Sequence, residues 1–354
     1  MKIIKRCFLI LGILLGVVLL AASGLFLMLV ITEFRPEPVE QVEVVGAAPT
    51  LDRSTFTILS WNIGYCALGE ESDFFMDGGR QVQPETEDWV DKNLAGIQAC
   101  LAARETDFVL FQEVDTDSQR SFHLNEAETL REKESLASTF ALNISCKFVP
   151  YPWPPIGKVN SGLLTTSRYA VSEASRISLP CPFSWPVSIA NFKRCLLVTR
   201  VPIADSEKEL VLVNLHLEGY DVDDGKIEQS KQLRAFLSEE YEKGNYVVAG
   251  GDWNQVFPGA EKNWPNTHGE LWSPGYLDAD ELDQGWSYVW DDTVPTCRLL
   301  NQPYKPSDTE GTQYYVIDGF LISPNLRMED VETVDAGFSC SDHNPVVLTL
   351  TLGD

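Results

Sequence analysis

Three apolar runs in this chain each end in a short polar fragment, and a fourth polar fragment immediately precedes a terminal apolar run. Runs of this length and composition are typical of buried β-strands. Polar side chains at strand ends can meet in loops that a rigid sheet holds in place. The pattern therefore favours sheets whose strand ends converge, and the fragments lie at residues 60–62, 111–113, 250–254 and 339–345.

Strand-like segments greatly outnumber long helices in the rest of the chain. The spacing of apolar residues predicts helices over 85–104 and 226–242. Strands are predicted over 56–60, 107–114, 143–149, 160–167, 194–201, 210–217, 246–250, 314–323 and 346–352. Most strands follow one another without a crossover helix. We therefore expect an α/β (α+β) four-layer sandwich, in which two mixed sheets pack face to face with helices outside.

The first 32 residues have the composition of a membrane anchor. Three basic residues precede an uncharged apolar stretch that extends from Cys7 to Thr32. About 20 apolar residues span a bilayer, whereas the core of a signal peptide is only about 7–15 residues long. The length favours a retained single-pass transmembrane helix, and cleavage after residues 21–23 is the alternative. Since the basic residues precede the helix, we expect a cytoplasmic N-terminus and an extracytoplasmic domain.

Residues 33–54 predict a stiff, partly extended linker, and residues 55–354 are long enough for one large domain. The net charge of −25 belongs to that domain, because the first 50 residues carry four acids and four bases. An acidic surface repels polyanions and releases no counterions from nucleic acid. This argues against a high-affinity nucleic-acid enzyme. Solubility of an exported domain is the more common reason for such a charge.

Seven cysteines follow the apolar N-terminal stretch without any Cys-x-x-Cys spacing, which argues against a zinc site. Export would permit disulfides, but an odd number leaves at least one thiol. Cys181 and Cys195 could pair across a hairpin, and the sequence leaves this pairing open.

Two ionisable residues near strand ends are candidates for chemistry. Glu113 follows an apolar run, where desolvation of a carboxylate is costly unless it is paired or bound to metal. The alternative is an ordinary acid in a strand-end turn. Strand alternation places His216 on the same face as Asn214. A lone histidine in such a strand is more often a hydrogen-bonded core residue than a catalyst.

Two further positions carry acids in unusual surroundings. In extended geometry Asp252 and Asn254 point to one side, about 7 Å apart, although an Asx-rich turn is the common alternative. Asp318 lies within an apolar strand and needs a partner, which a histidine often provides. It could instead cap a neighbouring backbone group. Each fragment alone is weak evidence for a functional site. The order in which the fragments occur together along the chain is stronger evidence.

Taken in this order, the fragments resemble the motifs of the endonuclease/exonuclease/phosphatase superfamily, the deoxyribonuclease I-like phosphoesterases, over roughly residues 55–352. The residues that carry the resemblance are Trp61-Asn62, Gln112-Glu113, Ser161-Gly162 to Ser167-Arg168-Tyr169, Asn214-Leu215-His216, Gly251-Asp252-Trp253-Asn254, Ile317-Asp318 and Ser341-Asp342-His343-Asn344-Pro345. The family fold is a two-sheet sandwich flanked by helices, in agreement with the expected order of elements.

The resemblance also implies a metal site. Glu113 would be the principal Mg²⁺ ligand, with Asn62 and Asp342 on the metal side, some of them through water. Mn²⁺ is the alternative ion. These are hard oxygen donors of the kind that Mg²⁺ prefers.

The catalytic roles come from the same resemblance. His343, oriented by Asp318, would activate the attacking water or steady the phosphoryl charge. Asp252 and Asn254 would position the nucleophile and the phosphate oxygens, and His216 would contact the phosphate from the other side. In-line attack on a phosphate ester needs charge neutralisation, a proton acceptor and fixed alignment.

The sequence thus predicts a membrane-anchored, Mg²⁺-dependent hydrolase of phosphate esters, of the phosphodiesterase, nuclease or phosphatase type, acting as a monomer. Its substrate would be nucleic acid, a phospholipid headgroup or a small phosphate ester. A sphingomyelinase-like lipid phosphodiesterase is an alternative within this class, and a non-catalytic surface binding module on the same scaffold is the alternative outside it. Residues 73–80 fit no branch of the family, and would be either a substrate lid or a loop pinned by aromatic residues.

Overall fold

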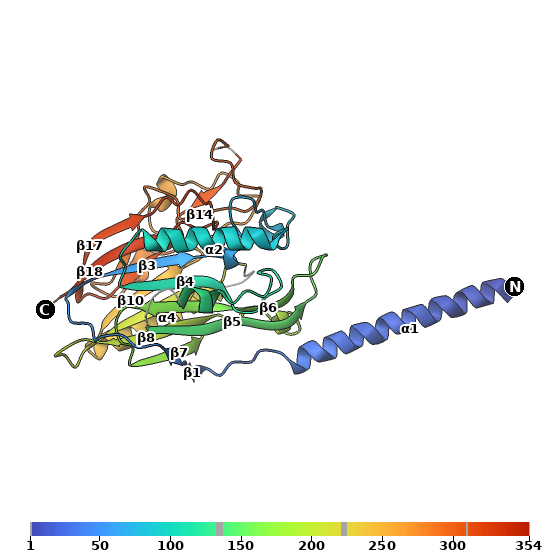
Figure 1. The fold of residues 1–354 in the computed structure, drawn as a ribbon, viewed down its shortest axis with the longest axis horizontal. Coiled ribbons are helices and arrows are strands. Elements are labelled where there is room, and N and C mark those ends of the chain that lie inside the picture. The colour runs from blue at the N-terminus through green and yellow to red at the C-terminus, as the bar shows by residue number, and fades with distance from the viewer. Residues whose placement is uncertain (1, 132–136, 221–224, 309–310, 354) are drawn as a thin grey trace.

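Two seven-stranded sheets packed face to face form the body of the protein (Figure 1). The computed structural model describes residues 2–131, 137–220, 225–308 and 311–353. Leucine, isoleucine, valine and phenylalanine side chains from both sheets fill the space between them. The predicted sandwich of two mixed sheets flanked by helices is confirmed.

The first sheet, called the β10 sheet after its central strand, mixes parallel and antiparallel pairs. Its order is β1 (Val39–Gln41), β7 (Glu173–Ser178), β8 (Cys195–Pro202), β9 (Glu209–His216), β10 (Tyr246–Asp252), β16 (Asp318–Ile322) and β13 (Ser287–Val289). Helix α4 (Gly225–Glu242) covers its outer face, where Leu233 and Leu237 pack against the strands.

The second sheet, called the β3 sheet, has the order β17 (Leu326–Thr333), β18 (Val346–Leu352), β3 (Thr55–Asn62), β4 (Phe108–Asp115), β6 (Gly157–Ser167), β5 (Ala137–Val149) and β2 (Val44–Val45). Helices α2 (Glu87–Ala102) and α3 (Glu126–Arg131) cover its outer face. Two short pairs complete the strands: β11 (Gln255–Val256) with β12 (Gly275–Tyr276), and β14 (Cys297–Arg298) with β15 (Tyr314–Tyr315). Five 3-10 turns occur in the described residues, at Gly64–Cys66, Phe75–Asp77, Val187–Ala190, Ala260–Lys262 and Ala279–Glu281.

Several predicted elements differ from the structure in extent. The strand expected over 314–323 is interrupted after Tyr315, so that β15 and β16 belong to different sheets. Strand β5 begins at Ala137 rather than at residue 143. Strands β7 and β17 were not predicted, because β7 combines two charged residues with two serines and β17 is a largely exposed edge strand.

Helix α1 (Lys2–Ile31) projects from one end of the sandwich (Figure 1). Among the described residues it is the single helix long and apolar enough to cross a membrane. Residues 33–54, expected to be a linker, contribute β1 and β2 to the edges of the two sheets, and Leu51 is fully buried in the core. The chain after α1 is therefore paired to the domain over part of its length.

All eight cysteines lie in the described residues, and each is a free thiol. Cys181 is exposed, whereas Cys195 is buried with its Sγ 3.2 Å from Asn143 Oδ1. The pairing of these two cysteines that the sequence left open is not formed.

Candidate active site

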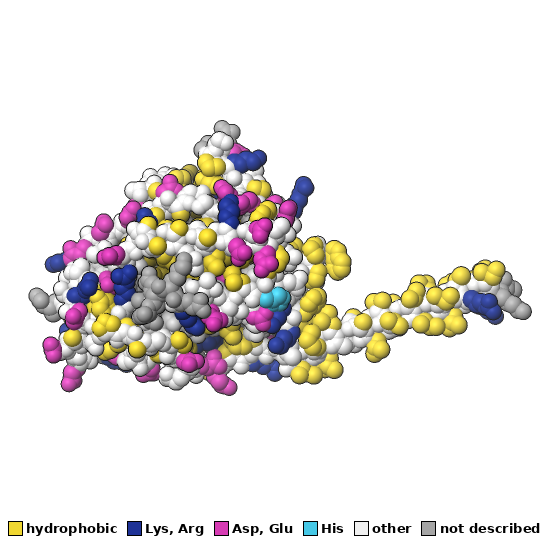
Figure 2. Space-filling model, in the orientation of Figure 1, with side chains coloured by type: hydrophobic (Ala, Val, Ile, Leu, Met, Phe, Trp, Pro, Cys, Tyr) yellow, Lys and Arg dark blue, Asp and Glu magenta, His cyan; other side chains and the backbone are white. Residues whose placement is uncertain are grey.

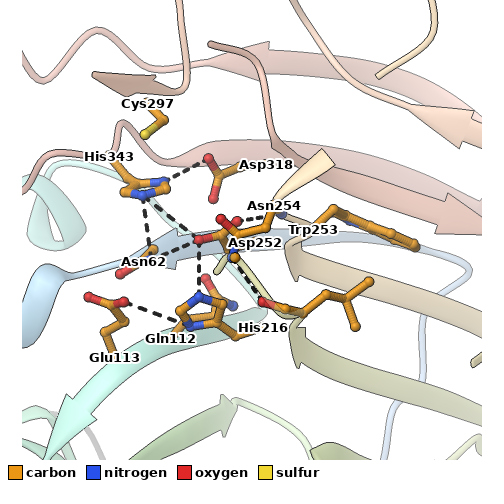
Figure 3. A network of polar contacts seen from close by, with 12 residues as sticks. Asn62, Gln112, Glu113, His216, Asp252, Trp253, Asn254, Cys297, Asp318 and His343 are labelled. Atoms are coloured by element: carbon orange, nitrogen blue, oxygen red, sulfur yellow. Dashed lines mark hydrogen bonds and ion pairs between the residues drawn. The ribbon is translucent and has the colours of Figure 1, made fainter. Parts of the chain in front are cut away.

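Strand register brings four of the predicted positions to one end of the sandwich. Asp252, the last residue of β10, pairs with His216 on β9 and with Asp318 on β16. On the facing sheet, Asn62 ends β3 and pairs with Gln112 of β4. Both sheets therefore present polar strand ends to the same space, as Figure 3 shows.

Asp318 and His343 form the shortest contact at the centre of this site. His343 Nδ1 lies 2.8 Å from Asp318 Oδ2, and both side chains are buried. The indole Nε1 of Trp61 donates to the carbonyl oxygen of His343 at 2.9 Å, which fixes the backbone of that loop. The partner that the sequence predicted for the buried acid at position 318 is thus a histidine 25 residues further along the chain.

The Asp318 carboxylate favours the charged form of this imidazole. Burial alone lowers the pKa of His343, but Asp318, together with Cys297 and Asp342, outweighs that effect and raises the pKa well above its usual value. Since Nδ1 faces Asp318, Nε2 is left to face the site, 3.8 Å from Asp252 Oδ2. His343 can therefore present a charged N–H to a bound anion.

Asp252 lies between the two histidines and the amide of the β3 sheet. Its Oδ2 accepts from Asn62 Nδ2 at 3.0 Å and lies 3.4 Å from His216 Nε2. Burial, followed by the charge of Asp318, raises the pKa of Asp252. A carboxylate in this state is a capable proton acceptor.

Asn254 does not have the extended geometry expected from the sequence. Its backbone adopts a left-handed conformation (φ 50°), and its N–H donates to Asp252 Oδ1 at 2.9 Å. The Asx turn that the sequence left as an alternative is therefore present. The Asn254 side chain donates to the carbonyl oxygen of Leu217 at 2.8 Å, so it lies beside Asp252 at the edge of the site.

His216 faces the same carboxylate from the β10 sheet, but its surroundings differ from those of His343. Burial lowers the pKa of His216 well below its usual value, and the positive charge of Arg194 lowers it further. Arg194 Nη1 donates to the carbonyl oxygen of His216 at 3.1 Å, and its Nε donates to Glu218 at 3.1 Å. The imidazole of His216 is therefore neutral, and it lies beside the ion pair of Arg194 and Glu218.

Glu113 and Asp342 place a second group of carboxylates beside the histidines. Glu113 Oε1 lies 3.9 Å from His216 Nδ1, and its backbone is left-handed (φ 58°). Burial, followed by the charge of Asp342, raises the pKa of Glu113. Among the described residues no lysine or arginine pairs with Glu113.

These donors fit a divalent cation. Asp342 and Asp252 are buried and Glu113 is partly buried, and each has a pKa raised by burial, which indicates negative charge without sufficient compensation. A bound cation supplies that compensation. A second group of ligand atoms within 4.8 Å of one another comes from Asp252, Asp318 and His343. We favour the Glu113 side for the cation, because the hydrogen bond between Asp318 and His343 already occupies an atom of each residue.

The structure also contains buried polar residues to which the sequence reasoning gave no role. Gln112 Nε2 donates to Asn214 Oδ1 at 2.8 Å, and Asn214 Nδ2 donates to the carbonyl oxygen of Phe111 at 3.1 Å. This amide pair joins the two sheets directly behind the site. Strand alternation places Asn214 on the same face as His216, and this pattern could have identified Asn214 from the sequence. No comparable pattern marks Arg194, which follows Lys193 at the start of the strand predicted over 194–201.

The match to known proteins agrees with this geometry. The model of the Endonuclease/Exonuclease/phosphatase family matches residues 59–343. This chain belongs to that family. Members of the family are phosphoesterase hydrolases, so the enzyme class predicted from the sequence is confirmed at this level. No curated protein matches the chain.

Solved structures of this family share the fold at low sequence identity. An endonuclease/exonuclease/phosphatase from Beutenbergia cavernae DSM 12333 is 18% identical, with a TM-score of 0.56, over 85% of this chain and 72% of that one. ANGEL2, a 2′,3′-cyclic phosphatase, is 14% identical, with a TM-score of 0.54, over 88% of this chain and 99% of that one. The human Nocturnin catalytic domain is 14% identical, with a TM-score of 0.51, over 88% and 97%. At these identities the likeness concerns the fold.

Proposed function

We infer that this chain is a divalent-metal-dependent hydrolase of phosphate esters, with Mg²⁺ as the ion and Mn²⁺ as an alternative. The observation that carries this proposal is the meeting of the Asp318–His343 pair, Asp252 and Glu113 at one end of the sandwich. Phosphate ester hydrolysis needs a cationic donor, a proton acceptor and a cation site close together. These side chains provide all three.

The proposed role of each residue follows from its charge. His343, charged and oriented by Asp318, donates from Nε2 to a phosphoryl oxygen as negative charge develops there. Asp252 accepts a proton from the attacking water, and Asn62 fixes the orientation of its carboxylate. A bound Mg²⁺ held by Glu113, with Asn62 and Asp342 beside it, would neutralise the phosphate. The sequence left two roles open for His343, and its raised pKa favours stabilisation of charge over activation of water.

Two residues complete the proposed site. Neutral His216 contacts the phosphate from the side of the β10 sheet, opposite His343. Asn254 holds Asp252 through its backbone N–H and positions the phosphate oxygens at the rim. The family's nuclease and phosphatase members and the 2′,3′-cyclic phosphatase named above support phosphate ester chemistry as the general class.

The membrane part of the proposal rests on α1. We infer that residues 1–32 form a single-pass anchor with a cytoplasmic N-terminus. Residues 33–54 then lead to an extracytoplasmic catalytic domain over 55–354 that acts as a monomer. A phospholipid headgroup or a small phosphate ester then becomes a substrate candidate beside nucleic acid. The acidic surface makes nucleic acid the least favoured of the three.

Calorimetry and hydrolysis together test this function. Purified full-length protein should bind Mg²⁺ and hydrolyse bis(p-nitrophenyl) phosphate only when Mg²⁺ is present. Glu113→Gln should lose both properties while keeping the thermal unfolding of a folded domain. Mg²⁺ binding without hydrolysis of plasmid DNA, phospholipid headgroups or small esters would instead support the non-catalytic binding module.

A further inference from the structure

Large apolar side chains are exposed at the end of the domain from which α1 projects. Tyr151 and Trp153 are 71% and 90% exposed in the connection between β5 and β6, and Trp185 and Val187 are 63% and 59% exposed near the turn Val187–Ala190. These four residues are called the aromatic face. Figure 2 shows hydrophobic side chains gathered in a band over this end of the domain, beside the helix. Single exposed apolar residues are ordinary, but a cluster marks a contact surface.

The aromatic face is continuous with the end of the proposed anchor. The Phe26 ring of α1 makes an edge-to-face contact with Trp185, with ring centroids 5.9 Å apart. Below them, Leu29 packs against Cys146 of β5 and Ile189 of the neighbouring turn. The last turns of α1 thus pack against the domain, so a bilayer that holds α1 reaches the same surface.

The site lies at this same end of the domain. Strands β3 and β4 run toward the end of the domain from which α1 projects (Figure 1), and they carry Asn62 and Glu113 there. The catalytic groups and the aromatic face therefore share one end of the sandwich.

A chain of contacts connects the aromatic face to the rim of the site. The Tyr151 ring lies 6.0 Å from the ring of Phe75, which begins the turn Phe75–Asp77. Asp77 Oδ1 accepts from the hydroxyl of Tyr220 at 2.8 Å, and Gly219 lies against the Asn254 side chain. Residues 73–80 are thus pinned by aromatic contacts between the surface and the site, which is one of the two roles that the sequence left open for them.

We propose that the aromatic face inserts into the interface of the bilayer that α1 spans and thereby turns the site toward lipid headgroups. The inference rests on the proposed anchor and on the proposed hydrolase. Tryptophan and tyrosine favour the membrane–water interface, where one side of the ring is apolar and the other is wet. The domain is strongly acidic, so insertion of apolar side chains rather than attraction to anionic lipid provides the contact. The membrane that the aromatic face contacts is accordingly a zwitterionic phospholipid bilayer.

Tryptophan fluorescence tests the docking directly, because none of the nine tryptophans lies in α1. The full chain is reconstituted in phosphatidylcholine vesicles with or without dibrominated acyl chains, which quench only tryptophans that reach the lipid. Two of nine tryptophans lie in the aromatic face, so we expect quenching of up to about two ninths of the emission if all emit equally. Trp153→Phe with Trp185→Phe should remove that quenching. The matched control is Trp286→Phe, which removes a half-buried tryptophan that packs against Tyr241 and should leave the quenching in place.

A second experiment distinguishes membrane docking from catalysis. Trp153→Ser with Trp185→Ser should lower hydrolysis of a vesicle-borne phosphate ester about tenfold. Hydrolysis of bis(p-nitrophenyl) phosphate in detergent should not change, because neither residue belongs to the catalytic groups. If the wild-type protein hydrolyses neither substrate, the proposed function fails while the quenching still decides the docking.

Two results would overturn the proposal. The first is absence of bromolipid quenching in the wild-type protein, or quenching that survives in the double phenylalanine variant. The second is a detergent-solubilised dimer that the double serine variant converts to a monomer in sedimentation, which would make the aromatic face an interface between two copies of the chain.

Discussion

His343, in the loop before β18, and His216, at the end of β9, approach the same oxygen of Asp252, with their Nε2 atoms 3.8 and 3.4 Å away, yet their surroundings drive their charges apart. Burial lowers the pKa of both imidazoles. At His343 the Asp318 carboxylate, helped by Cys297 and Asp342, outweighs it, whereas at His216 the charge of Arg194 adds to it. Two buried histidines a few ångströms apart thus become one cation and one neutral ring.

The difference shows that burial does not set the charge of a site histidine by itself. The charged groups around the ring decide the direction, and in each case they come from other segments of the chain. A phosphate held between the two rings would receive a charged donor from one side and a neutral contact from the other. The asymmetry gives the two histidines separate roles in the proposed reaction.

Removing His343 should have the largest effect. We expect His343→Ala to lower Mg²⁺-dependent hydrolysis of bis(p-nitrophenyl) phosphate by about 10²–10⁴-fold, because the charged donor to the phosphoryl group is lost. His216→Ala should lower it less, because a neutral ring stabilises less charge. Equal losses in kcat for the two variants would remove the distinction between the histidines. His123→Ala is the control, because that exposed histidine contacts Asp117 outside the site.

Asp318→Asn should remove the source of the asymmetry. The amide cannot stabilise the imidazolium, so the pKa of His343 should fall in the same direction as that of His216. In metal-free protein, NMR titration of the two imidazoles should show His343 protonated and His216 neutral at pH 7 before the substitution, and both neutral after it. We expect a loss of activity of about a hundredfold, less than for removal of the imidazole. An unchanged His343 titration would assign its charge to another group.

The pair of Arg194 and Glu218 should move His216 in the opposite direction. Replacing both, as Arg194→Met with Glu218→Gln, removes the positive charge beside His216, so its pKa should rise, although burial and the charge of His343 continue to lower it. The activity should change less than about tenfold, because neither residue touches the phosphate in the proposed arrangement. Arg194→Met alone leaves Glu218 buried and unpaired, which should cost about 3–5 kcal/mol in unfolding free energy. A His216 pKa that stays low in the double variant would leave burial as the main cause.

The sequence predicted the convergence of the site far better than its internal contacts. Glu113 and His343 lie 230 positions apart, but each is adjacent to an apolar strand, and the strand ends meet because the sheets pack face to face. Local pattern does not reveal the left-handed backbone at Asn254, which converts an expected extended segment into an Asx turn. Nor does it reveal that Arg194 is buried, since that depends on Glu218 from another segment.

The edges of the fold were predicted least well. Strand β17 has a row of exposed polar residues and pairs only with β18 in its sheet, so its sequence lacks the apolar alternation of a central strand. Residues 39–45 resemble a linker by composition, yet they add β1 and β2 to two sheet edges. Backbone pairing at an edge places few demands on side chains, and the sequence pattern is correspondingly weak.

The smallest effect should come from Glu240, a carboxylate at the far end of α4 where a cation again determines the charge. Its oxygens accept from Arg200 at 2.8 and 2.9 Å and from Lys243 at 2.8 Å. Burial raises the pKa of Glu240, but the hydrogen bonds from Arg200 and Lys243 outweigh it and lower the pKa to about 2. Because the folded-state pKa lies below the usual value of 4.5, the ionised carboxylate stabilises the fold above pH 4.5 and loses that contribution as the pH falls toward 2.

We therefore expect Glu240→Gln to lower the unfolding free energy by about 1 kcal/mol or less at pH 7, because Arg200 and Lys243 are partly exposed to solvent. The difference from wild type should shrink between pH 4.5 and pH 2, as followed by urea unfolding across that range. Glu239→Gln is the matched control, because that exposed neighbour on α4 pairs with Lys243 and with no other cation of the described residues. A difference that stays constant down to pH 2 would show that packing, rather than charge, accounts for the role of Glu240. The rule drawn from the two histidines would then apply to the site but not to the rest of the fold.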